Sequence, residues 1–365
     1  MKVTRVSVSN FLSYKQAAAE FDSGINIITG ENASGKTNLV DAIFFASIGR
    51  SSRHTREREI INWDSNIGAR ITVKLEKKFS KHEIDIYIDN SGGKRILIDG
   101  QPIQKMGELM GVLNIVFFSP SELTLIKGSP QDRRRFLDIS LSQQSRMYFY
   151  ALQRYFGLLA QRNKILKQYK LSSTLADMLE LTDREMAKVA AIIINERNKH
   201  IIALADYANA SHKKLTDGKE NLQITYETEN LNFDDLENDI YKLFKVAYND
   251  DVKQEYTTTG PHRDDVKITA NDIDLRKFGS QGQQRTSVLS LKLAEIELFK
   301  KRTSETPVLI LDDVLSELDE SRRNALLSSL VGIQTLITCT EFSKENFINC
   351  RAFQIKDQKI LIQDI

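Results

Sequence analysis

The chain has 365 residues, which is long enough for one large domain or two ordinary ones, each with its own core. With 41% hydrophobic and 27% charged residues and few Pro and Gly, it is neither fibrous nor disordered, and we expect order almost from end to end. The formal net charge of +2 neither requires nor excludes a nucleic-acid partner, so any such site must come from local clusters of Lys and Arg.

The cysteines and the apolar segments bear on the compartment. Cys339 and Cys350 form no CxxC pair and no zinc-like cluster, so we expect buried packing residues in a reducing cytoplasm. The longest apolar runs, such as residues 189–194, fall far short of the ~20 residues that a membrane span needs. We therefore expect a cytoplasmic protein with no membrane segment.

The predicted elements change in kind twice along the chain. Residues 1–127 contain short apolar runs at 25–28, 71–75, 84–88, 96–98 and 115–118, which predict strands. Residues 128–215 contain almost no Gly or Pro and predict two long amphipathic helices, joined near residues 171–173 and packed as a hairpin. Residues 216–365 return to an α/β pattern, with a helix over 287–299 and strands at 308–311 and 335–337. The prediction is one α/β domain, residues 1–127 and 216–365, split by a helical insertion at 128–215.

An aromatic stripe marks the first insertion helix, where Tyr148, Tyr155 and Phe156 recur at helical spacing. Such a stripe is either core or a base-stacking surface, and its spacing favours core.

Residues 30–37 read GENASGKT, which is the phosphate-loop pattern GxxxxGK[ST] between a predicted strand and a predicted helix. The glycines let the backbone curl so that N–H groups surround phosphate oxygens, and the helix N-terminus adds positive potential. Lys36 supplies a charge to the β- and γ-phosphates, and the Thr37 hydroxyl ligates Mg²⁺. We therefore expect a nucleoside triphosphate and Mg²⁺ here, with these residues around the nucleotide: Gly30, Glu31, Asn32, Ala33, Ser34, Gly35, Lys36, Thr37 and Asn38.

The strand predicted at residues 308–311 ends in Asp312 and Asp313. Four consecutive apolar residues fit a strand buried on both faces of a parallel sheet, and ligands bind at the carboxyl ends of such strands. We expect Asp312 to hold Mg²⁺ with Thr37, and Asp313 to polarise the attacking water. The predicted catalytic residues are therefore Lys36, Asp312 and Asp313.

Three further segments indicate the subclass. Residues 280–285, SQGQQR, resemble the ABC signature SGGQ, residues 316–319, SELD, resemble a D-loop, and residues 260–265 read GPHRDD. Together with the phosphate loop, these motifs in this order resemble the RecF family of DNA-repair ATPases, of the ABC/SMC type, over nearly the whole chain.

That resemblance implies an α/β fold of the ABC/SMC-like P-loop ATPase head type with a helical insertion lobe. It implies that Ser280, Gly282 and Gln283 contact ATP bound to a second copy, so that ATP drives a homodimer. It also implies binding to duplex DNA near single-strand gaps, RecR and RecO as partners, assistance to recombinase loading, and DNA-stimulated ATP hydrolysis.

The chain departs from the ABC/SMC pattern at several positions. Gln281 replaces the first glycine of the signature, and Asp313 stands where relatives carry the longer Glu, so we expect slow turnover. No histidine switch follows residues 335–337, and residues 118–122 give no clear glutamine loop. His262, beside Pro261, is expected to be structural.

Two arginine clusters are candidate DNA contacts. Arg53 and Arg56 follow the phosphate-loop helix, and Arg133, Arg134 and Arg135 open the insertion. Such runs fit phosphate contacts, which need charge but no base readout. Interleaved acidic residues fit an ordinary solvated face equally well, and by analogy with SMC proteins Arg53 is alternatively an ATP ligand.

Two other classes stay open. A different P-loop enzyme is one, although the sequence has no NKxD motif of a GTPase and no second motor domain of a helicase. An ATP-binding scaffold that barely hydrolyses ATP is the other, because Asp313 departs from the usual Glu.

Overall fold

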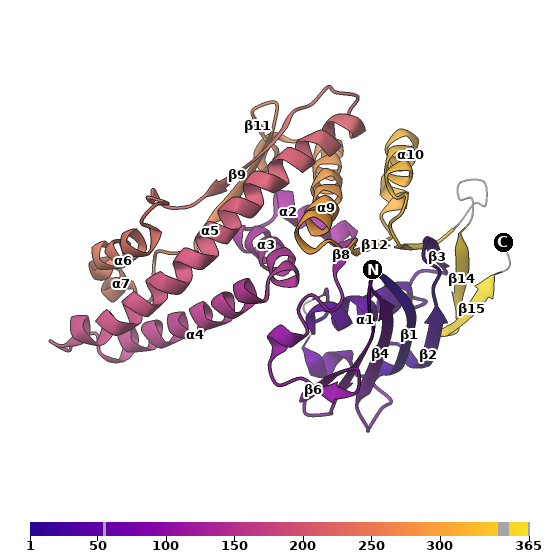
Figure 1. Cartoon of the computed structure of the whole chain (residues 1–365), viewed down its shortest axis with the longest axis horizontal. Coiled ribbons are helices and arrows are strands. Elements are labelled where there is room, and N and C mark those ends of the chain that lie inside the picture. The colour runs from indigo at the N-terminus through magenta and orange to yellow at the C-terminus, as the bar shows by residue number, and fades with distance from the viewer. Residues whose placement is uncertain (54–55, 342–349, 364–365) are drawn as a thin grey trace.

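The computed structural model describes residues 1–53, 56–341 and 350–363, and its first sheet is antiparallel with the strand order β2-β1-β4-β5-β6-β7 (Figure 1). Its strands are β1 (Lys2–Phe11), β2 (Tyr14–Glu20), β4 (Ala69–Glu76), β5 (Lys81–Ile88), β6 (Lys94–Ile98) and β7 (Gln101–Pro102). Buried and less buried side chains alternate along β4, because one face of the sheet covers the core and the other faces solvent.

The second sheet has the order β15-β14-β3-β13-β12-β8 and is parallel from β14 to β8. Its strands are β3 (Ile25–Thr29), β8 (Ile115–Phe118), β12 (Val308–Asp312), β13 (Thr335–Cys339), β14 (Arg351–Lys356) and the antiparallel edge strand β15 (Lys359–Gln363). Every residue of β8 and β12 is buried, which explains why both read as continuous apolar runs. Because β3 and β12 flank β13, two segments far apart in the sequence end at the same sheet edge.

Helix α1 (Lys36–Ile48) joins the two sheets into one core. Leu39 and Ile43 of this helix belong to the same buried cluster as Ile71 of the first sheet and Ile310 of the second. The phosphate-loop helix is thus held on both sides, as the predicted α/β ATPase head requires.

The segment after β8 forms the helical part of the molecule. Its helices are α2 (Thr124–Lys127), α3 (Pro130–Gln144), α4 (Arg146–Gln168), α5 (Leu175–Leu215), α6 (Leu236–Val246) and α7 (Tyr248–Gln254). Helices α4 and α5 pack side by side and project away from the sheets (Figure 1), which confirms the predicted hairpin. Tyr148 and Tyr155 are buried in it, as expected for core, whereas Phe156 is exposed.

A small antiparallel sheet and a long helix connect the helical part to the second sheet. They comprise β9 (Leu222–Glu227), β10 (Asp265–Ala270), β11 (Ile273–Asp274), α8 (Leu275–Phe278) and α9 (Gln281–Thr303), and α10 (Glu320–Ser329) follows β12. Helix α9 packs along α5 and against β8, and shares an apolar core with β9, β10 and β12.

The division of the chain into domains at 127/128 and 215/216 stays a proposal. The packing of helix α6 suggests an extension of the helical lobe. Ile240 and Phe244 of α6 are buried in one cluster with Tyr155 of α4 and Ile193 of α5. We therefore propose that residues 236–254 belong with the helical lobe, although they lie beyond residue 215.

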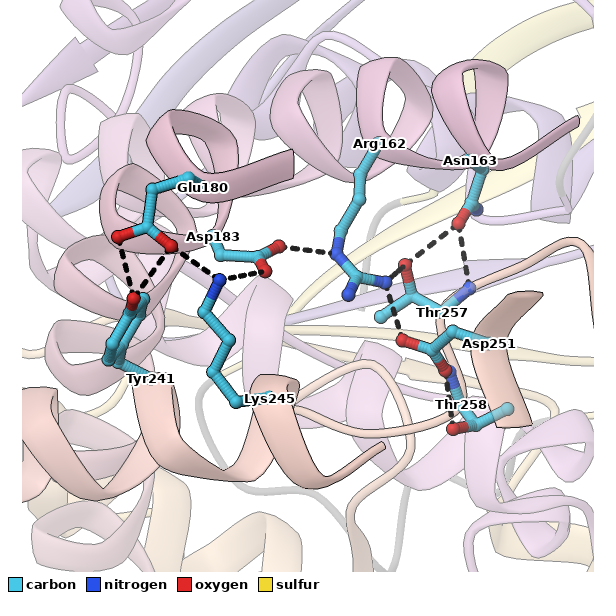
Figure 2. Close-up of polar contacts among 9 residues, drawn as sticks. All are labelled: Arg162, Asn163, Glu180, Asp183, Tyr241, Lys245, Asp251, Thr257 and Thr258. Carbon is cyan, nitrogen blue, oxygen red and sulfur yellow. Dashed lines mark hydrogen bonds and ion pairs between the residues drawn. The ribbon is translucent and has the colours of Figure 1, made fainter. Parts of the chain in front are cut away.

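Charged side chains tie together the far end of this lobe (Figure 2). The fully buried guanidinium of Arg162 on α4 pairs with Asp183 of α5 at 2.7 Å and with Asp251 of α7 at 2.6 Å, and donates to the Thr257 hydroxyl at 2.9 Å. Lys245 of α6 lies beside the same group, 3.7 Å from Asp183. One buried cation thus fixes three helices relative to one another.

The sequence analysis made expectations about membrane-spanning segments and about the cysteines. None of the helices in the described ranges is long and apolar enough to cross a membrane. Cys339 and Cys350 are half-buried rather than buried as expected. Partial burial at the end of β13 raises the pKa of Cys339 to about 11.

Candidate nucleotide-binding site

The loop between β3 and α1 is curled by three residues with positive φ: Gly30 (155°), Ala33 (64°) and Gly35 (111°). A Cβ atom on Gly30 would lie 2.6 Å from Ser34 Oγ, and one on Gly35 would lie 2.9 Å from the Tyr14 hydroxyl. Both glycines are therefore required by backbone conformation and by space. A loop curled in this way forms a concavity of N–H groups that binds anions.

Polar side chains of the loop match a phosphate ligand. Lys36 is buried, and its Nζ donates to the carbonyl oxygens of Gly30 at 2.9 Å and Glu31 at 3.0 Å. The buried Ser34 Oγ has no hydrogen-bond partner among the described residues. Because an unsatisfied buried hydroxyl costs free energy, a ligand rich in acceptor oxygens fits this loop.

The predicted metal ligands lie together at the carboxyl ends of the parallel strands of the second sheet. Thr37 Oγ1 donates to Asp312 Oδ1 at 3.0 Å, and Thr338 Oγ1 donates to the same oxygen at 2.7 Å. Burial raises the pKa of Asp312, and the two hydroxyl hydrogen bonds oppose that rise. A hydroxyl and a carboxylate are hard oxygen donors of the kind that Mg²⁺ prefers, so these residues fit the ion.

Asp313 lies at the same end of the sheet in a strained backbone conformation. Its φ of 55° is left-handed, and its N–H donates to Thr338 Oγ1 at 2.9 Å. After burial, the Asp313 carboxylate contributes to the raised pKa of Asp312 and of Cys339, so it lies near the predicted metal ligands. Backbone strain at a residue that is not glycine is often stored where function requires it.

Two supporting residues, Ser13 and Tyr14, were missed by the sequence analysis. The Tyr14 hydroxyl donates to the carbonyl oxygen of Gly35 at 2.9 Å, and Asn38 Nδ2 donates to Ser13 Oγ at 2.8 Å. Arg53 Nη2 donates to Asn38 Oδ1 at 2.9 Å, so Arg53 lies at the phosphate-loop helix. No sequence signal marks the turn between β1 and β2 as a support of this loop.

A cleft of about 530 Å³ opens beside Thr37 and Asp312. Arg135 of α3 and Lys292 of α9 line its other side. The Lys292 ammonium is nearly buried and pairs with Glu122 at 2.6 Å. The cleft thus separates the nucleotide edge of the sheet from the helical part of the chain.

The signature segment lies at an exposed helix start. Ser280 is the N-cap of α9: its Oγ accepts from the Gln283 N–H at 3.2 Å, and Gln283 Oε1 accepts from the Ser280 N–H at 2.9 Å. A Cβ atom added to Gly282 would first meet the Arg322 side chain, at 3.8 Å, so there is open space beside this glycine. The positive end of α9 is therefore open to a second molecule.

The D-loop contacts the same helix, since Arg285 Nε lies 3.3 Å from the carboxylate of Glu317. The segments that resemble the signature and the D-loop are thus neighbours within one chain.

The arginines that open the helical part do not form a free basic patch, and burial argues against Arg133 as a phosphate contact. Arg133 is buried and forms two hydrogen bonds with the Asp265 carboxylate, at 2.6 and 2.8 Å. Arg134 donates to the carbonyl oxygen of Asp264 at 2.6 Å, and Arg135 lines the cleft. The partners of Arg133 and Arg134 come from the GPHRDD segment, so at these two residues intramolecular contacts take the place of the expected phosphate contact.

Arg53 and Arg56, in contrast, are exposed. Of the five predicted DNA contacts, these two keep guanidinium groups open to solvent, and Arg53 also reaches the phosphate-loop helix.

His262 is structural, as expected. One ring nitrogen lies 2.7 Å from the Tyr155 hydroxyl and the other 3.1 Å from the carbonyl oxygen of Thr257. Burial lowers the pKa of His262 to about 4, so the ring is neutral at pH 7.

Comparisons with known proteins agree with this architecture. Residues 2–353 match the RecF/RecN/SMC N terminal domain family. The DNA replication and repair proteins RecF of Clostridium kluyveri and Clostridium acetobutylicum are 42% and 43% identical, over 99% and 93% of both chains. A solved structure of the recombination mediator protein RecF with ATP has a TM-score of 0.92 at 33% identity, over 99% of this chain and 97% of that one.

An SMC head structure, with a TM-score of 0.60 at 15% identity, shares the fold alone. The fold class predicted from the sequence is confirmed, and the chain belongs to the RecF family of DNA replication and repair proteins, within the RecF/RecN/SMC type of ATPases.

Proposed function

We propose that this chain is a slow ATPase that binds ATP and Mg²⁺ at residues 30–38 and dimerises around the nucleotide. The observation that carries the proposal is the contact between Thr37 and Asp312, because it sets a hydroxyl and a carboxylate beside the loop that holds Lys36. In this proposal Lys36 neutralises the β- and γ-phosphates, and Thr37 and Asp312 hold Mg²⁺. Asp313 orients the attacking water.

The dimer supplies the other half of the site. Ser280, Gly282 and Gln283 stand at an exposed helix start, whose N–H groups and positive end suit a γ-phosphate. We propose that these residues close over ATP bound to a second copy. ADP lacks the γ-phosphate, so it favours this dimer less than ATP does.

DNA is the proposed partner of the ATP-bound dimer. RecF relatives are described as DNA replication and repair proteins and as a recombination mediator of the RecFOR pathway, which supports a role in DNA repair. From the resemblance to the RecF family we further propose a duplex near a single-strand gap as the DNA, RecR and RecO as partners, and assistance to recombinase loading. In this chain Arg53 and Arg56 are the exposed arginines proposed for phosphate contacts. We further propose that DNA stimulates the hydrolysis.

Sedimentation with ADP, with ATP, and with ATP plus gapped duplex tests dimerisation and DNA binding together. We expect a dimer with ATP only, and a larger complex when DNA is added. Lys36→Ala should stay monomeric and lose tight ATP binding in a nucleotide titration, whereas Lys188→Ala, at an exposed position of α5, should match the wild type. A wild type that sediments identically with ADP and ATP contradicts the proposal.

A scaffold that binds ATP without useful turnover is the second candidate, because Asp313 is one methylene shorter than the usual Glu. Steady-state ATPase assays with and without DNA separate the two. Turnover at the level of the Asp313→Asn variant, even with DNA, favours the scaffold.

A further inference from the structure

A run of hydrogen bonds leads from the signature segment into helix α5. It passes through Glu220, His212 and Ser290, which are not part of the proposed nucleotide site. Gln283 Nε2 donates to Glu220 Oε1 at 2.9 Å. The other oxygen of that carboxylate, Glu220 Oε2, lies 2.9 Å from His212 Nε2. On its far side, His212 Nδ1 lies 3.0 Å from Ser290 Oγ.

These residues come from three parts of the chain. His212 lies in the last turn of α5, Glu220 in the connection from α5 to β9, and Gln283 and Ser290 on α9. His212 and Ser290 are completely buried, and the Glu220 side chain is about 20% exposed. Hydrogen bonds in such a poorly solvated place fix geometry more firmly than surface contacts do.

Glu220 controls how the Gln283 amide is turned. The amide oxygen of Gln283 accepts from the Ser280 N–H, while its nitrogen donates to Glu220. Both ends of the amide are therefore occupied, and only one orientation satisfies both partners. Without the carboxylate, the amide is free to rotate away, and the capping box that holds Ser280 is weakened.

We propose that Glu220, supported by His212, is a positioning residue for the signature segment. It holds Gln283, and through the capping box Ser280, in the orientation that meets a phosphate bound to a second copy. This inference rests on the proposed function, because it assigns Glu220 a role only if the start of α9 closes over that nucleotide.

Three variants separate positioning from general stability. Glu220→Ala removes both hydrogen bonds of the carboxylate. Glu220→Gln keeps an acceptor for Gln283 and offers an N–H to a neutral His212 ring. Glu227→Ala, at the exposed end of β9, is the matched control.

The readouts are ATP affinity of the monomer by titration, the dissociation constant of the ATP-dependent dimer by sedimentation, and the thermal unfolding midpoint. Glu220→Ala should weaken the dimer by about tenfold or more, the usual effect of losing a hydrogen bond to a charged group, while ATP affinity of the monomer stays at the wild-type value. Glu220→Gln and Glu227→Ala should dimerise within about threefold of the wild type.

A charge-swap pair covers the case in which Glu220→Ala does not fold. Gln283→Glu places a second carboxylate within hydrogen-bond distance of the Glu220 carboxylate. The two negative charges repel each other, so this variant should weaken the dimer. Adding Glu220→Gln restores a donor–acceptor pair and should recover at least about threefold of that loss.

The outcomes distinguish this inference from the proposed function. If the wild type dimerises with ATP and Glu220→Ala does so equally well, the positioning role is overturned while the proposed function stands. The role is also overturned if Glu220→Gln is as weak as Glu220→Ala, or if Glu220→Gln fails to rescue Gln283→Glu. A wild type that stays monomeric with ATP overturns the proposed function, and this inference falls with it.

Discussion

The Thr37 hydroxyl donates a hydrogen bond of 3.0 Å to the Asp312 carboxylate, although 275 positions separate the two residues. The parallel sheet accounts for this proximity, because β13 pairs with β3 on one side and with β12 on the other. The loops that leave β3 and β12 therefore start at one edge, and Thr338 at the end of β13 bonds to Asp312 between them. The sheet thus brings a phosphate loop and an acidic strand end into one site.

Asp313→Asn should slow ATP hydrolysis by at least about 100-fold, the low end of the usual effect of losing a general base. ATP binding should change little, because the phosphate loop is untouched, and the ATP-bound dimer should last longer. Phosphate release and sedimentation measure the two effects. Asp206→Asn, at an exposed position of α5, is the matched control. Wild-type turnover in Asp313→Asn contradicts the assigned role.

Much of this site was predictable because its motifs are local. The phosphate loop needs glycines at fixed spacing, and Gly30 and Gly35 are required by positive φ and by contacts below 3 Å. An apolar run that ends in two carboxylates marks a buried parallel strand, which is how Asp312 was found.

The supporting residues were not predictable, because their partners are distant in sequence and follow no short pattern. Tyr14 supports Gly35 across 21 positions, and Glu220 reaches Gln283 across 63. A tyrosine at the start of a strand and a glutamate in a connection have many equivalent surroundings, and only the tertiary fold selects one.

The burial of Arg133 had a signal in the sequence. Arg133, Leu137 and Leu141 are spaced four residues apart on α3, and all three are buried on one face of that helix. A run of three arginines cannot point in one direction on a helix, so at least one must leave the solvent face.

Arg56 and Arg133 should respond differently to substitution. Because log affinity for duplex DNA falls with log salt concentration by about 0.9 per phosphate neutralised, Arg56→Ala should reduce that slope by about one. Arg133→Ala should leave the slope unchanged and lower stability instead, since it leaves Asp265 without its partner. DNA titrations at several salt concentrations, with urea unfolding, measure both. An unchanged slope in Arg56→Ala would remove that residue from the DNA contacts.

Arg162 should be among the most sensitive positions of the helical lobe. Arg162→Met leaves the buried carboxylates of Asp183 and Asp251 without the guanidinium that joins them, and breaking a buried ion pair typically costs roughly 3–5 kcal/mol of unfolding free energy (Figure 2). Arg154→Met, which breaks an exposed pair with Glu185 on the same helix hairpin, should cost less than about 1 kcal/mol. Urea unfolding of both variants gives the comparison. Equal losses would mean that the buried pairs contribute no more than a surface pair.

His200 should make stability depend on pH below neutrality. This residue of α5 is buried with Nε2 unpartnered among the described residues, and burial lowers its pKa from 6.5 to about 3. Between those values the unfolded chain binds a proton that the folded chain does not, so stability is full above pH 6.5 and is lost as the pH falls. One proton corresponds to at most about 1.4 kcal/mol per pH unit. His200→Leu should therefore reduce the stability difference between pH 7 and pH 5 by about 2 kcal/mol in urea unfolding. Lys199→Leu, at an exposed position of the same helix, should leave that difference unchanged. If His200→Leu and the wild type show the same pH dependence, the pKa of His200 does not differ between the folded and the unfolded chain.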